Sequence, residues 1–155
     1  MALSEINAVT TETRVAARPE TVFAFFVDPD KMVRWMGLRA ELDPRPGGRY
    51  AVDINAQARA RGAFVEVVPH SRVVFTFGWE EDPNVPAGST TVEVTLTPDG
   101  DGTLVRLVHR GLTTAEMREQ HRHGWQHYLA RLAAAGGGGD PGPDPNANPP
   151  QEDGR

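Results

Sequence analysis

Two kinds of hydrophobic spacing alternate along the chain and predict its elements. Over residues 113–135 the spacing is helical, and one face collects Met117, His121, Gly124, Trp125, Tyr128, Leu129 and Leu132. Thr113 or Thr114 can cap the start of this helix, and the glycine run that begins at Gly136 ends it. At about 1.5 Å per residue the helix is about 30 Å long, so a wide apolar surface must receive its buried face.

The N-terminal part of the chain predicts one strand followed by two short helices. Residues 6–15 alternate β-branched and polar side chains in part, which is typical of a strand with one wet face. Pro19 suits the first position of a helix, and the apolar run that follows it stops at Asp28 because the residue before a proline avoids the helical region. Asp30 can cap a second short helix over residues 31–35.

From residue 38 onward the period changes to two. Alternating segments cover residues 38–43, 49–54, 62–68, 73–79, 91–96 and 104–109, with proline, glycine and aspartate turns between them. Phe64 and Glu66 share one parity, so the inward face of the segment 62–68 is undetermined. Strands joined by short turns pair antiparallel. The sequence therefore predicts an α+β fold in which a curved antiparallel sheet of about seven strands wraps around the long C-terminal helix.

The chain of 155 residues is long enough for one domain. We assign residues 1–135 to that domain. Residues 136–155 contain no apolar side chain larger than Ala147 or proline, so we expect a disordered, Gly/Pro-rich tail.

Composition and charge disfavour nucleic-acid and membrane partners and exclude cysteine chemistry. The net charge is −5 and the pI is about 5.5, which disfavours nucleic acid and anionic membranes as partners. Cysteine is absent, so disulfides and thiolate metal sites are excluded. The N-terminus does not resemble a signal peptide, and no segment has the apolar length of a membrane span. We therefore expect a cytoplasmic protein.

Four segments together carry a resemblance to a known family. They are TVFAFFVDPDKMVRW, RGAFVEVVPHSRVVFTFGWE, TTVEVTLTPDGDGTLVRLVHRGL and GWQHYLARL. Their order and spacing resemble the START-like or SRPBCC superfamily over residues 11–132, and most closely the branch related to the C-terminal domain of the activator of the heat-shock-protein-90 ATPase. The resemblance implies a helix-grip fold with a cavity between helix and sheet. It also implies relatives that bind hydrophobic molecules, act as cyclases or dehydratases, or serve as co-chaperones, and it implies no shared catalytic residue.

Inward-facing aromatic and polar side chains are the candidate lining of such a cavity. They are Phe23, Phe26, Trp35, Tyr50, Phe75, Phe77, Trp79, His109, His121, Trp125 and Tyr128. The alternative is that the same side chains fill a packed core. Gly124 favours the cavity, because a glycine costs helix stability and here permits close approach of a strand or a ligand.

Histidines are the candidates for proton transfer or metal binding. His109 and His121 fall on inward positions, where an imidazole with a pKa of about 6.5 can act as acid or base. The alternative is a buried histidine whose ring nitrogens bond Tyr50, Tyr128 or backbone groups. His123 and His127 have the i, i+4 spacing of metal ligands, with Glu116 on the same stripe, but a solvated helix face is the default. We find no standard nucleotide-binding, serine-hydrolase or zincin motif and expect no cofactor or metal.

We therefore favour a non-catalytic protein that binds a small hydrophobic molecule. The first alternative is a polyketide cyclase or dehydratase-like enzyme that uses the same cavity, with a histidine or an inward carboxylate as the base. A convergent acid and base pair on inward strand positions would favour this enzyme, and Glu66 is the one ambiguous candidate for the carboxylate. The second alternative is a co-chaperone-type interaction module. A homodimer is possible.

Overall fold

A computed structural model describes residues 6–147 and contains one seven-stranded antiparallel sheet. The strand order is β1-β7-β6-β5-β4-β3-β2, so every chain neighbour from β2 to β7 pairs with the next and β1 closes against β7. The elements are β1 (Ala8–Val15), α2 (Pro19–Val27), α3 (Pro29–Met32), β2 (Arg39–Leu42), β3 (Arg49–Asn55), β4 (Ala58–Val68), β5 (Arg72–Phe77), β6 (Thr90–Asp99), β7 (Gly102–Arg110) and α4 (Ala115–Gly136). The predicted α+β class and element order are confirmed.

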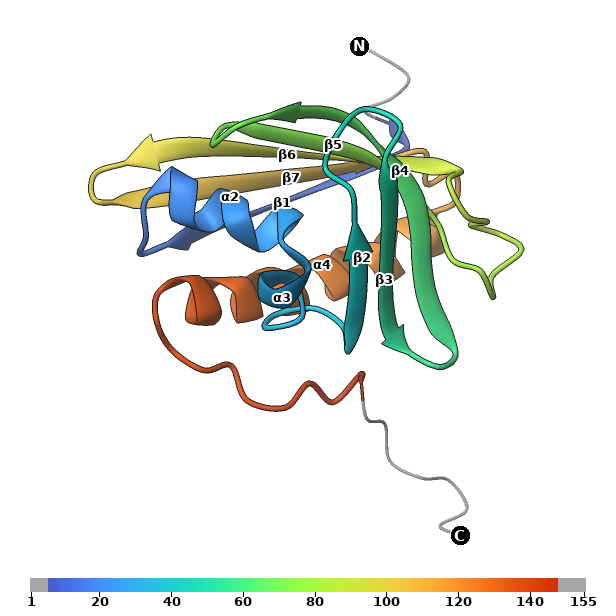
Figure 1. The fold of residues 1–155 in the computed structure, drawn as a ribbon. Helices are drawn as coiled ribbons and strands as arrows, with labels where there is room; N and C mark the ends of the chain where they lie inside the picture. The colour runs from blue at the N-terminus through green and yellow to red at the C-terminus, as the bar shows by residue number, and fades with distance from the viewer. Residues whose placement is uncertain (1–5, 148–155) are drawn as a thin grey trace, which may run out of the picture.

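Helix α4 lies under the curved sheet, while α2 and α3 cover one end of the same face (Figure 1). Thr114 is the N-cap, and its hydroxyl accepts a hydrogen bond from the backbone N–H of Met117 at 3.1 Å. The buried face of α4 contains Trp125, Tyr128, Leu129, Leu132, Ala135 and Gly136. This is the helix-grip arrangement. None of the helices within residues 6–147 has the length and apolar character needed to cross a bilayer.

A β-bulge in β4 explains why its inward face was ambiguous. The register against β5 shifts between Phe64 and Glu66, so Val65 is an extra residue and the parity reverses there. Phe64 is buried and Val67 packs against the core, whereas the Glu66 carboxylate is exposed and accepts a hydrogen bond from Arg72 at 2.9 Å. The one candidate for an inward carboxylate on the strands therefore points to solvent.

The start of the C-terminal tail differs from the expectation. Residues 140–147 lie along α4 instead of leaving the domain, and Figure 1 shows this segment running below the helix. Asp144 and Ala147 are buried, and the Arg131 guanidinium donates to the carbonyl oxygen of Gly142 at 3.0 Å. Polar and backbone hydrogen bonds hold a segment that lacks large apolar side chains, which composition alone does not reveal. The predicted disorder of residues 148–155 lies outside the described residues, as do residues 1–5 of the predicted domain.

Candidate functional site: a pocket under the C-terminal helix

A pocket of about 220 Å³ lies between α4 and the ends of the strands. Its aromatic wall comes from β5 and the residues after it and from the buried face of α4. The lining residues are Met36, Ile54, Phe77, Trp79, Asp82, Gln120, His121, Gly124, Trp125 and Tyr128. Apolar side chains dominate, and the polar ones are few, which is the usual character of a small-molecule site.

Gly124 keeps the middle of the pocket open. A Cβ atom built on this residue has no neighbour within 4 Å, so the glycine does not serve close packing against a strand. Gly136, at the end of the same helix, is the opposite case, because a Cβ there would lie 2.7 Å from Cγ1 of Val15. A glycine inside a helix costs about 1 kcal/mol relative to alanine. Of the two explanations suggested by the sequence, space for a ligand fits Gly124 better than approach of a strand.

Five of the predicted cavity residues line the pocket, and six do not. Phe77, Trp79, His121, Trp125 and Tyr128 are in its wall. The other six residues belong to the packed interior. Tyr50 and Phe75 stack with ring centroids 4.0 Å apart, and Phe26 and Trp35 meet edge to face at 5.2 Å. Phe23 is half-buried beside His70, and His109 packs against Trp125. The alternation along a strand identifies inward residues, but it does not separate those that pack against other core rings from those that face the open space.

His109 is locked in a chain of buried hydrogen bonds. The indole N–H of Trp125 donates to Nδ1 of His109 at 3.0 Å, so Nδ1 is the unprotonated nitrogen. Nε2 lies 2.7 Å from Oγ1 of Thr90, whose own hydrogen is donated to the carbonyl oxygen of Phe77 at 2.6 Å. Nε2 must therefore carry the proton that Thr90 accepts.

This arrangement leaves His109 no free nitrogen for catalysis. Burial, reinforced by the nearby ring of His121, lowers the pKa of His109 to about 3. His109 is therefore the buried, hydrogen-bonded histidine that the sequence suggested as the alternative to catalysis. Its partners are Trp125 and Thr90 instead of Tyr50, Tyr128 or the backbone. The residue fixes the orientation of Trp125 in the pocket wall.

His121 is held in the other tautomer. Its Nδ1–H donates to the carbonyl oxygen of Met117, one turn earlier, at 2.8 Å, and its Nε2 accepts from the indole N–H of Trp79 at 3.1 Å. The Trp79 to His121 bond joins the end of the sheet to α4 across the pocket. His121 is therefore a residue of the pocket wall whose acceptor nitrogen, Nε2, is engaged by the indole N–H of Trp79.

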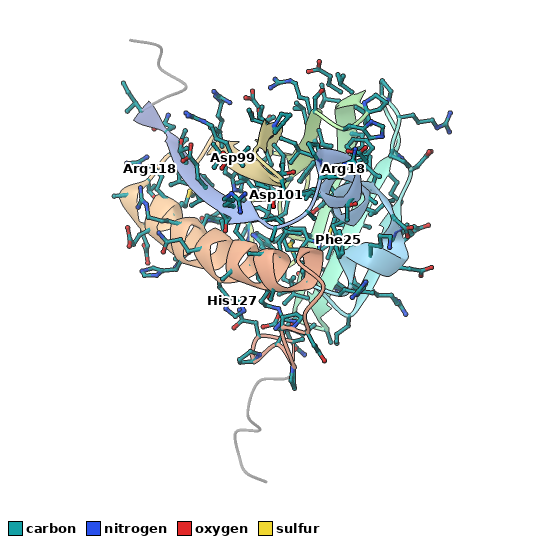
Figure 2. The ribbon with its side chains drawn as sticks, turned by 90° about the vertical axis from the view of Figure 1, so that its left-hand side faces the viewer. Arg18, Phe25, Asp99, Asp101, Arg118 and His127 are labelled. Atoms are coloured by element: carbon teal, nitrogen blue, oxygen red, sulfur yellow. The ribbon has the colours of Figure 1, made fainter. Side chains whose placement is uncertain are left out.

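The tail supplies the partner of the remaining aromatic wall residue. The hydroxyl of Tyr128 donates to Oδ2 of Asp144 at 2.7 Å, and Nε2 of His127 lies 2.9 Å from Oδ1 of the same carboxylate. Figure 2 shows His127 on the side of α4 that faces the tail. Burial of Asp144 opposes its ionisation, but the bonds from Tyr128 and His127 outweigh burial and hold the pKa of this carboxyl below its ordinary value. Burial and the bond to Asp144 raise the pKa of Tyr128, which stays a neutral donor.

We expect Asp144→Ala to lower the free energy of unfolding by about 1 kcal/mol at neutral pH, because Tyr128 and His127 lose their shared acceptor. Since the pKa of Asp144 is lowered, its contribution is present at neutral pH and is lost as the pH falls below the ordinary aspartate range. Urea unfolding measures the change. Asp144→Asn, which still accepts from Tyr128, should lose less. Equal stability of both variants and the original protein would contradict the packing of residues 140–147 on α4.

Sequence reasoning missed four lining residues. Met36 and Ile54 are buried apolar residues without a distinguishing pattern, while Asp82 and Gln120 are polar residues from a loop and from the rim of α4. Asp82 belongs to the acidic, proline-containing loop 80–88 between β5 and β6, and it places part of that loop in the pocket wall. Its individual residues carried no sequence signature of a site.

The surface histidines of α4 do not form a metal centre in the described chain. His123 pairs with Glu119 at 3.1 Å, and His127 turns to Asp144. Within residues 6–147, no three histidine or acidic side chains gather closely enough to hold a metal ion.

Comparison with known proteins agrees with the observed architecture. The model of the family described as Activator of Hsp90 ATPase homolog 1-like protein matches residues 16–137. The chain belongs to this family. The predicted resemblance to the SRPBCC superfamily and to its Hsp90-activator branch is thereby confirmed.

Solved structures similar to this AHSA1-like chain come from diverse organisms. An AHSA1-like protein from Rhizobium etli is 49% identical over 89% of this chain and 86% of its own, with a TM-score of 0.72. CalU16 from Micromonospora echinospora is 27% identical over 81% of this chain and 73% of its own, with a TM-score of 0.66. An Hsp90 activator from Plasmodium falciparum is 20% identical over 81% and 92% of the two chains, with a TM-score of 0.67, and shows similarity of fold alone. No curated protein matches the sequence.

Proposed function

We propose that this AHSA1-like protein binds a small, largely hydrophobic molecule in the pocket between α4 and the sheet. The observation that carries the proposal is an open space at Gly124 surrounded by the rings of Phe77, Trp79, Trp125 and Tyr128. A well-packed core leaves few spaces of this size, and a helix bears the cost of a central glycine without gaining any packing contact from it. The cytoplasmic location expected from the sequence is part of the proposal.

The volume of the pocket suggests the size of the buried part of the ligand. An apolar cavity of about 150 Å³ in another protein accepts benzene. A pocket of about 220 Å³ therefore fits a two-ring aromatic group or an aliphatic group of similar bulk. Because the pocket is not enclosed, a longer ligand can extend from it.

Native mass spectrometry combined with thermal unfolding tests the proposal. The freshly purified protein is compared before and after denaturation, and stripped protein is then heated with naphthalene, 2-naphthalenemethanol and aliphatic alcohols of similar volume. We expect either a small mass that disappears on denaturation or a rise in Tm with the two-ring probes. A clean mass together with an unchanged Tm for every probe at its solubility limit would refute the proposal.

The cyclase or dehydratase alternative lacks a paired acid and base in this pocket. Both ring nitrogens of His109 are engaged, the acceptor nitrogen of His121 is occupied by Trp79, and Glu66 lies on the outer surface. The remaining carboxylate in the lining is that of Asp82. Among the described residues, the pocket lining therefore suits binding better than acid–base catalysis, which needs a paired acid and base.

The interaction-module alternative rests on the family and on the Plasmodium falciparum neighbour, which is an Hsp90 activator. Its test is a pull-down with the middle domain of the chaperone, repeated with the pocket blocked by Gly124→Leu. Retention of both proteins would support an interaction surface separate from the pocket. Failure of the original protein to be retained would count against this alternative.

A further inference from the structure

We propose that the ligand carries a cationic amine or ammonium group, which binds between the aromatic rings and Asp82 in the pocket. This inference rests on the proposed function and names the chemical class of the molecule bound there. It follows from which polar groups of the pocket wall are already used and which are free.

The hydrogen-bond donors of the aromatic wall are all committed inside the protein. Trp79 donates to His121, Trp125 donates to His109, and Tyr128 donates to Asp144. What these residues offer to a ligand is the surface of their rings, and the face of an aromatic ring carries negative partial charge. Such rings attract a cation that lies within about 6 Å of the ring centre.

Asp82 adds a full negative charge to the pocket lining. The two preceding carboxylates, Glu80 and Glu81, are paired with Arg59, and Glu80 also with Arg61. Half-buried Asp82 instead uses Oδ1 to accept the backbone N–H of Asn84 at 2.9 Å, and within residues 6–147 no ion pair neutralises it. A carboxylate that lines a pocket without a cationic partner favours a ligand that supplies the positive charge.

The lining also contains no positively charged side chain that would neutralise an anion. None of its ten residues is a lysine or arginine. The ring nitrogen of His121 that is not bonded to its own helix acts as an acceptor for Trp79. Fatty acids and other carboxylate-bearing molecules would have to bring their charge next to Asp82, which opposes binding by like-charge repulsion. The pocket therefore discriminates among hydrophobic molecules by the charge of their head group.

A matched series of naphthalene derivatives tests this inference. The probes are the cation (2-naphthylmethyl)trimethylammonium, the neutral alcohol 2-naphthalenemethanol and the anion 2-naphthaleneacetate. They share the ring and differ in head-group charge. We expect calorimetry at low ionic strength to give the cation about 10-fold higher affinity than the alcohol, and the anion the weakest binding. Asp82→Asn, which keeps the size of the side chain, should bring the cation to within about 3-fold of the alcohol.

Asp30→Asn is the control variant, because it removes the same charge from an exposed position on α3 and should leave the ranking unchanged. Equal binding of all three probes would overturn the inference while leaving the proposed function intact. Stronger binding of the anion would also overturn it, and so would a preference for the cation that Asp82→Asn does not reduce. Failure of every probe to bind, together with a clean native mass of the freshly purified protein, would refute both proposals.

Discussion

Gly124→Leu should abolish ligand binding while leaving the protein folded. The added side chain enters a space in which the Cβ atom meets no neighbour within 4 Å, so it fills the pocket instead of colliding with the sheet. Replacing a central helix glycine by leucine also favours the helix by about 0.8 kcal/mol. We therefore expect an unchanged or higher Tm together with a loss of affinity of about 100-fold or more for a two-ring probe, equivalent to about 2.7 kcal/mol.

Two smaller substitutions act as controls for this prediction. Gly124→Ala should raise the free energy of unfolding by about 0.5 to 1 kcal/mol and weaken binding only slightly, because one methyl group occupies little of the pocket. Gly136→Ala should give no such gain, since its Cβ would press on Val15. Circular dichroism with thermal unfolding and calorimetry measure the two effects separately. A folded Gly124→Leu protein that binds the probe as tightly as the original would place the ligand elsewhere.

His109→Leu should be the most destabilising of the substitutions considered, and its cost should depend on pH. At pH 7.5 we expect a loss of about 2 to 4 kcal/mol, because the indole N–H of Trp125 and the hydroxyl of Thr90 lose a buried partner. The pKa of His109 is lowered by burial to about 3 in the folded protein, whereas an exposed histidine has a pKa of about 6.5. The neutral ring thus stabilises the fold fully above about pH 6.5, and this contribution declines as the pH falls toward 3.

The difference in the free energy of unfolding between the original protein and His109→Leu should therefore shrink by about 2 kcal/mol between pH 7.5 and pH 5. Urea unfolding of both proteins at the two pH values measures it, and the titration of all other groups cancels in the comparison. A penalty for His109→Leu that is the same at both pH values would contradict the buried neutral state of this histidine.

The sequence predicted the fold because its patterns are local and repeated. The period-two segments, the turn residues between them and the long amphipathic helix each indicate one element, and short connections leave few ways to pair the strands. The inward face of β4 could not be assigned from the sequence because a single extra residue, Val65, reverses the parity. A bulge of this kind leaves no clear mark in composition. The packed part of the tail was missed because its attachment depends on Asp144, a polar residue among prolines and glycines.

The candidate site was predictable only in part. Helical spacing identified Trp125, Tyr128 and Gly124 as neighbours on the buried face, and strand parity identified Phe77. Which inward aromatic residues face the pocket and which pack against other core rings is a property of tertiary packing. Asp82 reaches the pocket from an irregular loop, where no periodicity exists to indicate the direction of a side chain.

The most direct test of the account follows the three tryptophans of the chain during a titration with 2-naphthalenemethanol. Each indole N–H gives its own signal in a two-dimensional ¹H–¹⁵N NMR spectrum. Trp79 and Trp125 line the pocket, whereas Trp35 lies outside the lining and donates to the carbonyl oxygen of Phe25 at 3.0 Å. We predict saturable shifts of the Trp79 and Trp125 signals with little change at Trp35. No shift at the solubility limit, or equal shifts at all three tryptophans, would contradict a ligand pocket under α4.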